Sequence, residues 1–264
     1  MASGRFTYVA GDMRRGLKSP AAHNTLTVDG KDFTVYKNSW DYSRMAQPVK
    51  GEYFFAGSRG LISGGHLGYL SEGVFVFRKI VRAAEGLFVI FDELYAEGRH
   101  RYTQYFHFNN EGEVVTRSGR AVFYHGKTAR AKLDILTPGA ELALTEAPLS
   151  RTYNELEYGK CLTSECNKEN FAGLVTVVST APAASSDDAV SELIPVSLTR
   201  TGEILPDEKA QAVKIKNERG AYTVVCLHGE VISEVGLIEA NGKKGYGKVI
   251  VFPPDNPDGI VLAW

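Results

Sequence analysis

The sequence lacks the features that define several large protein classes. It has three cysteines in 264 residues, Cys161, Cys166 and Cys226, and a sparse, odd number does not build a disulfide framework. The Cys161–Cys166 pair has no second pair with which to complete a zinc site, so we expect all three to be reduced core or surface thiols. No apolar run approaches the roughly 20 residues of a membrane-spanning helix. No hydrophobic signal core follows Met1, which leaves periplasm, extracellular space and cytoplasm all open.

Excess charge and the common catalytic motifs are also missing. The formal net charge is -1, from 30 basic and 31 acidic residues, and no basic run is interleaved with aromatic residues. We therefore expect neither nucleic acid nor a membrane surface as a partner. The chain contains no nucleophile elbow, phosphate-cradling loop, His-Glu-x-x-His motif or dinucleotide fingerprint. Nucleophilic hydrolysis, phosphoryl transfer and hydride transfer consequently have no support.

Aromatic and β-branched residues, in contrast, are plentiful, with 13 Tyr and 13 Phe. They gather in three long runs, Gly73–Arg82, Leu87–Tyr95 and Tyr102–Phe108, which are separated by Glu85-Gly86 and by Gly98. Runs of this composition, divided by tight turn signals, predict an antiparallel meander of three strands.

The rest of the chain repeats this pattern in shorter form. Apolar residues do not recur at helical spacing over three turns anywhere, and we expect an all-β, large antiparallel two-sheet sandwich with little or no helix. The loop Pro182–Asp188 is too short for a linker, so we expect one domain over 1–264. Further strands are predicted at Phe33–Tyr36, Glu52–Ala56, His66–Leu70, Glu113–Arg117, Ala121–Tyr124, Ala129–Leu136, Glu141–Leu144, Leu174–Ser179, Val196–Thr199, Ala212–Lys216, Tyr222–Leu227, Val235–Glu239, Lys248–Phe252 and Ile260–Leu262.

One stretch near the N-terminus combines a histidine with a clear strand signal. His23 precedes the alternating run 24–28, which ends in the hairpin-turn pair Asp29-Gly30. A sheet would thus hold His23 at the entry to a strand. A histidine fixed in this way can act as a metal ligand or an acid–base group, or it can simply bond to a neighbouring backbone group.

Two further residues are candidates for binding. His66 lies among glycines that allow close approach of a backbone or ligand. Arg78 shares an otherwise apolar strand face and needs a carboxylate partner from a substrate or from the protein. Asp92 and Glu93 lie across the predicted hairpin, so we favour a partner from the protein. A metal-dependent enzyme centred on His23 and His66 is a weaker alternative.

The remaining histidines carry less information. His100 and His107 are seven residues apart on one presumed strand and would face opposite sides of it, so they cannot share a metal there. For His100, His125 and His228 we expect surface positions or satisfied structural roles. No metal site can be assembled from this set by spacing alone.

The ordered segments of the chain resemble a known family. Ser19–Gly30, which contains Ala22-His23-Asn24-Thr25, is similar to the β-sandwich domain of heparinase II/III-like polysaccharide lyases. Later pieces follow in the family's order and extend the resemblance to about residue 180. These pieces are Arg5–Tyr8 before the main segment and His66–Tyr69, Phe77–Ile80, Phe91-Asp92, Arg99–His107 and Ser150–Asn154 after it.

The resemblance implies a two-part enzyme that cleaves acidic polysaccharides at uronic acids by β-elimination. An N-terminal helical toroid would be the partner that supplies most catalytic groups. The resemblance also implies a divalent metal, zinc or calcium, in the full-length enzyme, and His23 is the one transferable ligand. On this basis we assign His66, Tyr69 and Arg78 to substrate binding, whereas the catalytic residues stay unassigned.

The sequence also departs from the family plan. It has neither the helical toroid nor the first sandwich strands, and a single histidine cannot hold zinc tightly. We therefore expect the sandwich part of a lyase, with little or no activity alone. The alternative is a non-catalytic carbohydrate-binding or interaction module.

Overall fold

A large curved sheet dominates the computed structural model, which describes residues 3–180, 189–229 and 236–264. Ten strands form it, and every pairing is antiparallel. The main path runs through β4 (Pro48–Ala56), β5 (Arg59–His66), β6 (Val74–Ala84), β7 (Leu87–His107), β12 (Glu157–Thr180), β10 (Thr128–Ile135), β9 (Arg120–His125) and β8 (Glu113–Arg117); β1 (Leu26–Val28) pairs with β7, and β11 (Glu141–Leu149) pairs with β12.

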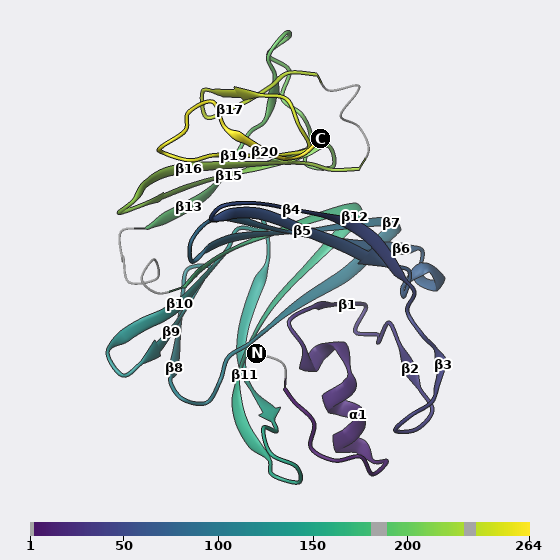
Figure 1. The fold of residues 1–264 in the computed structure, drawn as a ribbon. Helices are drawn as coiled ribbons and strands as arrows, with labels where there is room; N and C mark the ends of the chain where they lie inside the picture. The colour runs from purple at the N-terminus through teal and green to yellow at the C-terminus, as the bar shows by residue number, and fades with distance from the viewer. Residues whose placement is uncertain (1–2, 181–188, 230–235) are drawn as a thin grey trace.

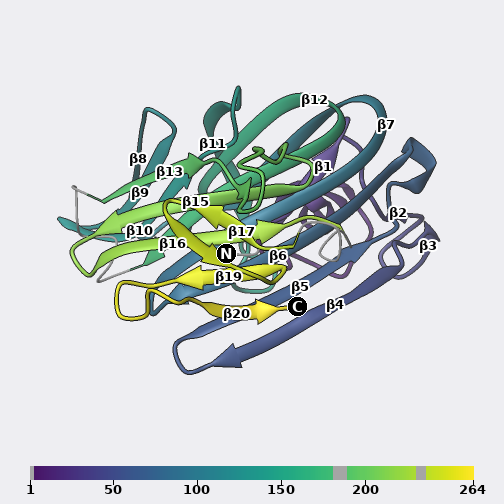
Figure 2. The same ribbon diagram turned by 90° about the horizontal axis from the view of Figure 1, so that it is seen from above.

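A second sheet lies on one face of the large sheet (Figure 1), and the large sheet extends beyond it when seen from above (Figure 2). The predicted all-β two-sheet sandwich is confirmed. The second sheet contains β13 (Val190–Ile194), β15 (Ala210–Asn217), β16 (Gly220–Leu227), β19 (Val249–Phe252) and β20 (Ile260–Ala263). Two small sheets are formed by β14 (Ser197–Leu198), β17 (Ile238–Ala240) and β18 (Lys243–Gly245), and by β2 (Val35–Tyr36) and β3 (Tyr42–Arg44).

The N-terminal residues lie on the opposite, concave face of the large sheet (Figure 1). They form the helix α1 (Asp12–Lys18) and the 3-10 helix η1 (Pro20–Ala22), and a second 3-10 helix, η2 (Leu70–Glu72), precedes β6. An acidic residue in the first turn of α1 and basic residues in its last turn complement the helix dipole. The prediction of little or no helix is confirmed.

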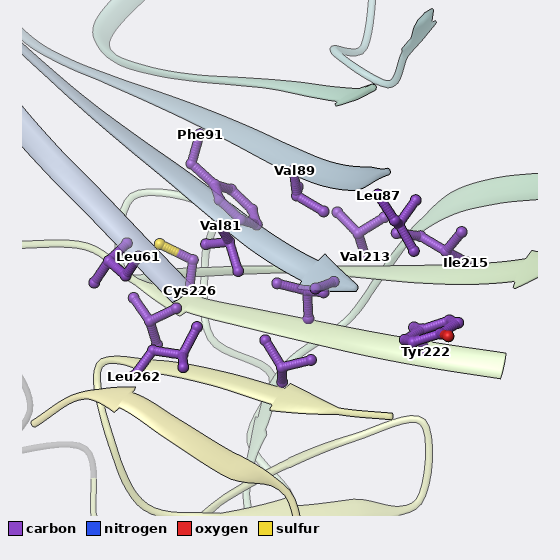
Figure 3. Packing of buried hydrophobic residues seen from close by; sticks show 14 of the residues in the cluster. Leu61, Val81, Leu87, Val89, Phe91, Val213, Ile215, Tyr222, Cys226 and Leu262 are labelled. Atoms are coloured by element: carbon purple, nitrogen blue, oxygen red, sulfur yellow. The ribbon is translucent and has the colours of Figure 1, made fainter. Parts of the chain in front are cut away.

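Strand alternation gives the large sheet two different buried faces. On β6 and β7, Val81, Val89 and Phe91 point toward the second sheet and belong to the main core (Figure 3). Val76 and Leu94 point to the concave face and pack there in a separate cluster. Each fully buried side chain of this size contributes about 1.5–3 kcal/mol, so both faces stabilise the sheet.

Strand β7 corrects the predicted meander. The sequence analysis divides 87–108 at Gly98, whereas β7 runs from Leu87 to His107 without a break. Gly98 has a φ of 85° and donates its N–H to Asn170 Oδ1 at 3.2 Å, while Asn170 has a φ of 61° in β12. The glycine therefore marks a bend shared by two paired strands, where the register shifts, rather than a turn.

Two further boundaries differ from prediction. The predicted strand His66–Leu70 is wrong, because β5 ends at His66 and the chain then leaves the sheet toward η2. The predicted strand Leu174–Ser179 is only the last part of β12, whose polar first half was missed. The predicted loop Pro182–Asp188 and the first residue of the predicted strand Val235–Glu239 lie outside the described residues.

The predicted turn after β1 is confirmed, but the hairpin is wrong, because β1 pairs with β7 and the predicted strand Phe33–Tyr36 pairs with β3. Asp29 and Gly30 both have positive φ, 53° and 69°, and the Lys31 N–H donates to the Val28 carbonyl at 2.9 Å. The Asp29 carboxylate also lies 2.8 Å from His100 Nδ1 on β7. The turn thereby fixes β1, and with it the chain that follows His23, against the large sheet.

Candidate functional site

The concave face of the large sheet holds an ion pair. Arg78 on β6 is directly opposite Asp92 on β7, and its Nε and Nη2 atoms donate to the two carboxylate oxygens at 2.5 and 2.7 Å. Gln104 Nε2 donates to the same carboxylate at 2.7 Å, and Arg78 Nη1 donates to the Asn24 carbonyl at 2.8 Å. Burial opposes the charge on Arg78, but Asp92 outweighs it and raises the Arg78 pKa. The predicted protein partner is confirmed.

His66 lies beside this pair and has a defined tautomer. The Gly68 N–H donates to His66 Nδ1 at 3.2 Å, so the ring proton is on Nε2. His66 Nε2 is buried and has no hydrogen-bond partner among the described residues. Burial, with a smaller contribution from Arg78, lowers the pKa of His66 and keeps it neutral. His66, Arg78 and Asp92 line one cavity of about 290 Å³.

Tyr69 lies behind His66 instead of in this cavity. It is fully buried, and its hydroxyl donates to the Lys31 carbonyl at 2.8 Å. The centroid of its ring lies 5.7 Å from that of the His66 ring, and both rings contact the ring of Phe33. Desolvation is the main cause that raises the Tyr69 pKa above its usual value. In this structure Tyr69 supports the imidazole, and its contact with substrate stays a prediction.

His23 follows η1 and precedes β1, as expected for a histidine at a strand entry. Its N–H donates to the Pro20 carbonyl at 3.0 Å, and its own carbonyl accepts the Thr25 N–H at 2.8 Å. Within residues 3–180, 189–229 and 236–264, the one group of three closely spaced potential metal ligands does not include His23. The metal-ligand role expected for His23 in a full-length enzyme thus stays a prediction.

An exposed cluster of aromatic and basic side chains was missed by the sequence analysis. Tyr8 stacks on Trp40 with 5.4 Å between ring centroids and an interplanar angle of 11°, and Tyr153 lies 5.8 Å from Tyr8. The Arg5 guanidinium carbon is 4.9 Å from the centre of the Tyr8 ring, and that of Arg14 is 5.7 Å from it. We call Arg5, Tyr8, Arg14, Trp40 and Tyr153 the aromatic–basic patch.

Both the charge and the exposure of the patch favour an acidic, ring-shaped ligand. Trp40 is 67% exposed although it is a large apolar residue, and burying it in a contact would be favourable. Arginine forks bind carboxylate and sulfate groups through paired hydrogen bonds. Arg15, Lys18 and Lys37 line a hollow together with Arg14 and extend the positive surface. The missed signal was the basic run 14–18, whose aromatic partners come from distant positions.

The fold and these sites define an all-β sandwich domain whose concave face carries a buried ion pair. The chain belongs to a known family, because the model of the heparinase II/III-like C-terminal domain matches residues 1–170. It is thus a domain of a polysaccharide lyase family, as the resemblance implied. A search of curated protein sequences finds no match.

Solved structures share this fold. A heparinase III has a TM-score of 0.66 at 15% identity, and the match covers 85% of this chain and 34% of that chain. The heparan sulfate lyase HepC from Pedobacter heparinus has a TM-score of 0.66 at 13% identity, covering 86% and 34%. A further heparinase III has a TM-score of 0.61 at 15% identity, covering 82% and 31%. The chain spans about a third of the length of each.

The comparisons extend the likeness in fold beyond the part that matches the family model.

No helix among the described residues is long and apolar enough to cross a membrane. All three cysteines are free and buried, in agreement with the reduced thiols predicted. His100 and His107 both lie on β7, as expected for one strand.

Proposed function

We propose that this chain is the sandwich part of a polysaccharide lyase that acts on a uronic-acid-containing glycan, and that the aromatic–basic patch binds the glycan. The observation that carries the proposal is the exposed Tyr8–Trp40 stack with Arg5 and Arg14 against the Tyr8 ring. Sugar rings stack on such faces, and the arginines pair with uronate or sulfate groups. The titles of the structural relatives, heparinases and a heparan sulfate lyase, support this substrate class.

The proposed reaction is β-elimination. The uronate carboxylate is neutralised, a base removes the C5 proton, and an acid protonates the departing glycosidic oxygen as the C4–O bond breaks and a C4–C5 double bond forms. Arginines such as Arg5 and Arg14 are suited to the first task. The structural relatives are about three times longer than the part matched here, which supports a second domain, a helical toroid, as the source of the acid–base groups.

Binding by the patch can be measured through its own tryptophan. The sequence has two tryptophans, so Trp264→Phe leaves Trp40 as the sole tryptophan, which can be excited selectively over tyrosine. We expect oligosaccharides of heparan sulfate, alginate or hyaluronan to change Trp40 fluorescence with a salt-dependent affinity, and neutral cello-oligosaccharides to have no effect. Calorimetric titration of the unmodified chain should give the same order of affinities for these oligosaccharides.

Variants locate the binding surface. Trp40→Ala and Arg14→Gln should each weaken binding about tenfold, which corresponds to about 1.4 kcal/mol. Tyr53→Ala is the matched control, because Tyr53 is an exposed aromatic residue on β4 outside the patch. Absence of binding to every acidic glycan, or equal loss in the Tyr53 control, contradicts the proposal.

Activity separates the lyase proposal from its alternative. We expect this chain alone to produce little or no unsaturated uronate, measured by its ultraviolet absorbance, because the patch supplies binding groups without an assigned base. Robust turnover by the chain alone would refute this expectation. Binding without turnover, even in a longer form that includes a toroid, would favour the non-catalytic carbohydrate-binding module.

A further inference from the structure

A second group of polar side chains is buried between the two sheets, on the face opposite the Arg78–Asp92 pair. Glu93 on β7 meets Cys226 at the end of β16 and His228 just after it, and all three are buried. Cys226 lies at the edge of the main core beside Leu61 and Phe91 (Figure 3). No part of the proposed glycan site uses this cluster.

The three potential ligand atoms have the spacing of a tetrahedral zinc site. Cys226 Sγ lies 3.8 Å from His228 Nδ1 and 3.9 Å from Glu93 Oε1, and the Nδ1–Oε1 distance is 3.0 Å. Zinc bonds of about 2.0 Å to nitrogen or oxygen and 2.3 Å to sulfur give ligand–ligand separations of roughly 3.4–3.6 Å in a tetrahedron. The observed separations differ from these by about 0.4 Å, so small side-chain adjustments suffice.

The surrounding hydrogen bonds orient the histidine as a ligand. Gln211 Nε2 donates to the Gly173 carbonyl at 3.2 Å, so its Oε1 faces His228 Nε2 at 3.1 Å and accepts the ring proton there. His228 Nδ1 then presents a lone pair to Glu93 Oε1, and two acceptors face each other across 3.0 Å. A cation between them removes this conflict. A histidine ligand whose other nitrogen donates to a fixed carbonyl is typical of metal sites.

The other groups near the cluster are compatible with a metal. Tyr95 donates its hydroxyl to the second carboxylate oxygen of Glu93 at 2.7 Å, and Lys79 forms an ion pair with Oε1. A metal must therefore displace the Lys79 ammonium from Oε1, and Lys79 can keep its 2.8 Å hydrogen bond to the Leu227 carbonyl. A proton on Nδ1 is the competing solution, and a cation bound between Nδ1 and Oε1 replaces that proton.

A cavity reaches one member of the cluster, Glu93. It has a volume of about 580 Å³, and its lining includes Lys79, Glu93 and Tyr95 as well as the aromatic side chains of Phe75 and Phe77. An ion can reach Glu93 from this side. A water molecule or a small ligand in the cavity can occupy the fourth coordination position, as in zinc sites that keep an open position.

We propose that Glu93, Cys226 and His228 bind a zinc ion between the two sheets, with the fourth position open to the cavity. The ligand set of thiolate, imidazole and carboxylate suits zinc and excludes calcium and magnesium, which prefer oxygen alone. On binding, the Cys226 thiol releases its proton to solvent and a Zn–S bond forms. The Cys226 thiolate and the Glu93 carboxylate then balance the two charges of the ion, and the Lys79 ammonium, displaced from Glu93, remains beside the Leu227 carbonyl as a positive charge that opposes binding.

Cobalt(II) provides a direct spectroscopic test. We expect the metal-free protein to bind one equivalent of Co²⁺, with visible d–d bands of tetrahedral intensity and a near-ultraviolet thiolate-to-cobalt band. Added Zn²⁺ should remove both signals, whereas Ca²⁺ and Mg²⁺ should leave them unchanged. Failure of the folded chain to bind one equivalent, or a spectrum without a thiolate band, would overturn the proposal.

Variants distinguish this site from adventitious binding at surface histidines. Cys226→Ser should abolish the thiolate band and weaken zinc binding at least 100-fold, and Gln211→Ala should weaken it about 10–100-fold. Cys166→Ser is the matched control, because Cys166 is also buried and free but lies on the concave side. Lys79→Met should tighten binding about tenfold by removing a neighbouring positive charge.

Folding of each variant is checked by circular dichroism. Equal zinc affinity in the wild-type and Cys226→Ser proteins, with Lys79→Met unchanged as well, would assign the metal to another place and overturn the proposal. The glycan measurements are independent, because they read Trp40 on the other face of the sheet.

Discussion

Each face of the β6–β7 hairpin buries a carboxylate, and the two faces neutralise it with different cations. Consecutive residues place Arg78 and Asp92 on the concave face and Lys79 and Glu93 on the face toward the second sheet. Arg78 and Asp92 are directly opposite and form a two-pronged pair. Glu93 is opposite Phe77, so Lys79 reaches it diagonally.

This difference shows that the type of cation controls whether a buried carboxylate can bind further partners. The Arg78 guanidinium donates to both oxygens of Asp92, and Gln104 donates to one of them as well. Each oxygen of Asp92 therefore already accepts a hydrogen bond, and the carboxylate has little capacity to bind a further cation. The ammonium of Lys79 is a point charge and leaves Glu93 shared with Tyr95 and His228. Lys79 pairs with Oε1 of Glu93 and Tyr95 donates to Oε2, so an additional cation can bind Glu93 only by displacing the Lys79 ammonium. Asp92, in contrast, is a structural anchor beside the His66 cavity.

Breaking the concave pair should have the largest effect. Arg78→Met leaves the fully buried Asp92 carboxylate without its cation, and we expect a loss of about 3–5 kcal/mol in the free energy of unfolding. The double variant Arg78→Met/Asp92→Leu should recover most of this loss. Urea unfolding measures both.

A surface pair is the control for this prediction. Arg151 pairs with Glu111 and Glu157 but is 38% exposed and screened by solvent, so Arg151→Met should cost far less stability than Arg78→Met. If Arg78→Met and Arg151→Met cost the same, the concave pair is not the anchor described here.

Removing the cation on the other face should cost less. Lys79→Met leaves Glu93 bonded to Tyr95 and near His228, and methionine fills much of the lysine volume. We therefore expect a loss of about 1–3 kcal/mol in the free energy of unfolding, measured with a chelator present to keep the protein free of metal. Excess Zn²⁺ should reduce that loss, because the ion replaces the ammonium as the counter-charge. A loss that exceeds that of Arg78→Met would reverse the comparison.

A neutral hydrogen bond on the concave face should contribute still less. Tyr69→Phe removes the donor to the Lys31 carbonyl but keeps the buried ring, and we expect a loss of about 1 kcal/mol by urea unfolding. Glycan binding by the aromatic–basic patch should be unchanged. A change in glycan affinity without loss of stability would instead support the predicted substrate contact of Tyr69.

The smallest effect concerns pH. The pKa of His66 is lowered in the folded state by burial and Arg78, so the unfolded chain binds more protons below about pH 6.5. This contribution to stability is fully present above that pH and is lost as the pH falls toward the folded pKa. His66→Gln should flatten the pH dependence of the free energy of unfolding between pH 5 and 7.

The strand pattern and the turn chemistry were largely readable from the chain. Glu113–Arg117 was predicted with the bounds of β8, and the Asp29-Gly30 turn has the positive φ values that its residues favour. The prediction failed at Gly98, because a glycine in a strand can mark either a turn or a bend. Only the pairing of β7 with β12 decides between them.

The sequence by itself determined the all-β class, the resemblance to the lyase family and the need of Arg78 for a carboxylate. Tertiary structure alone decided which distant residues meet, because the meeting of Tyr8 with Trp40, or of Glu93 with Cys226 and His228, depends on how layers pack. Local periodicity reports which face a side chain takes. It does not predict which residues of the opposing sheet lie against that face. Both proposed binding sites could therefore be identified only from the fold.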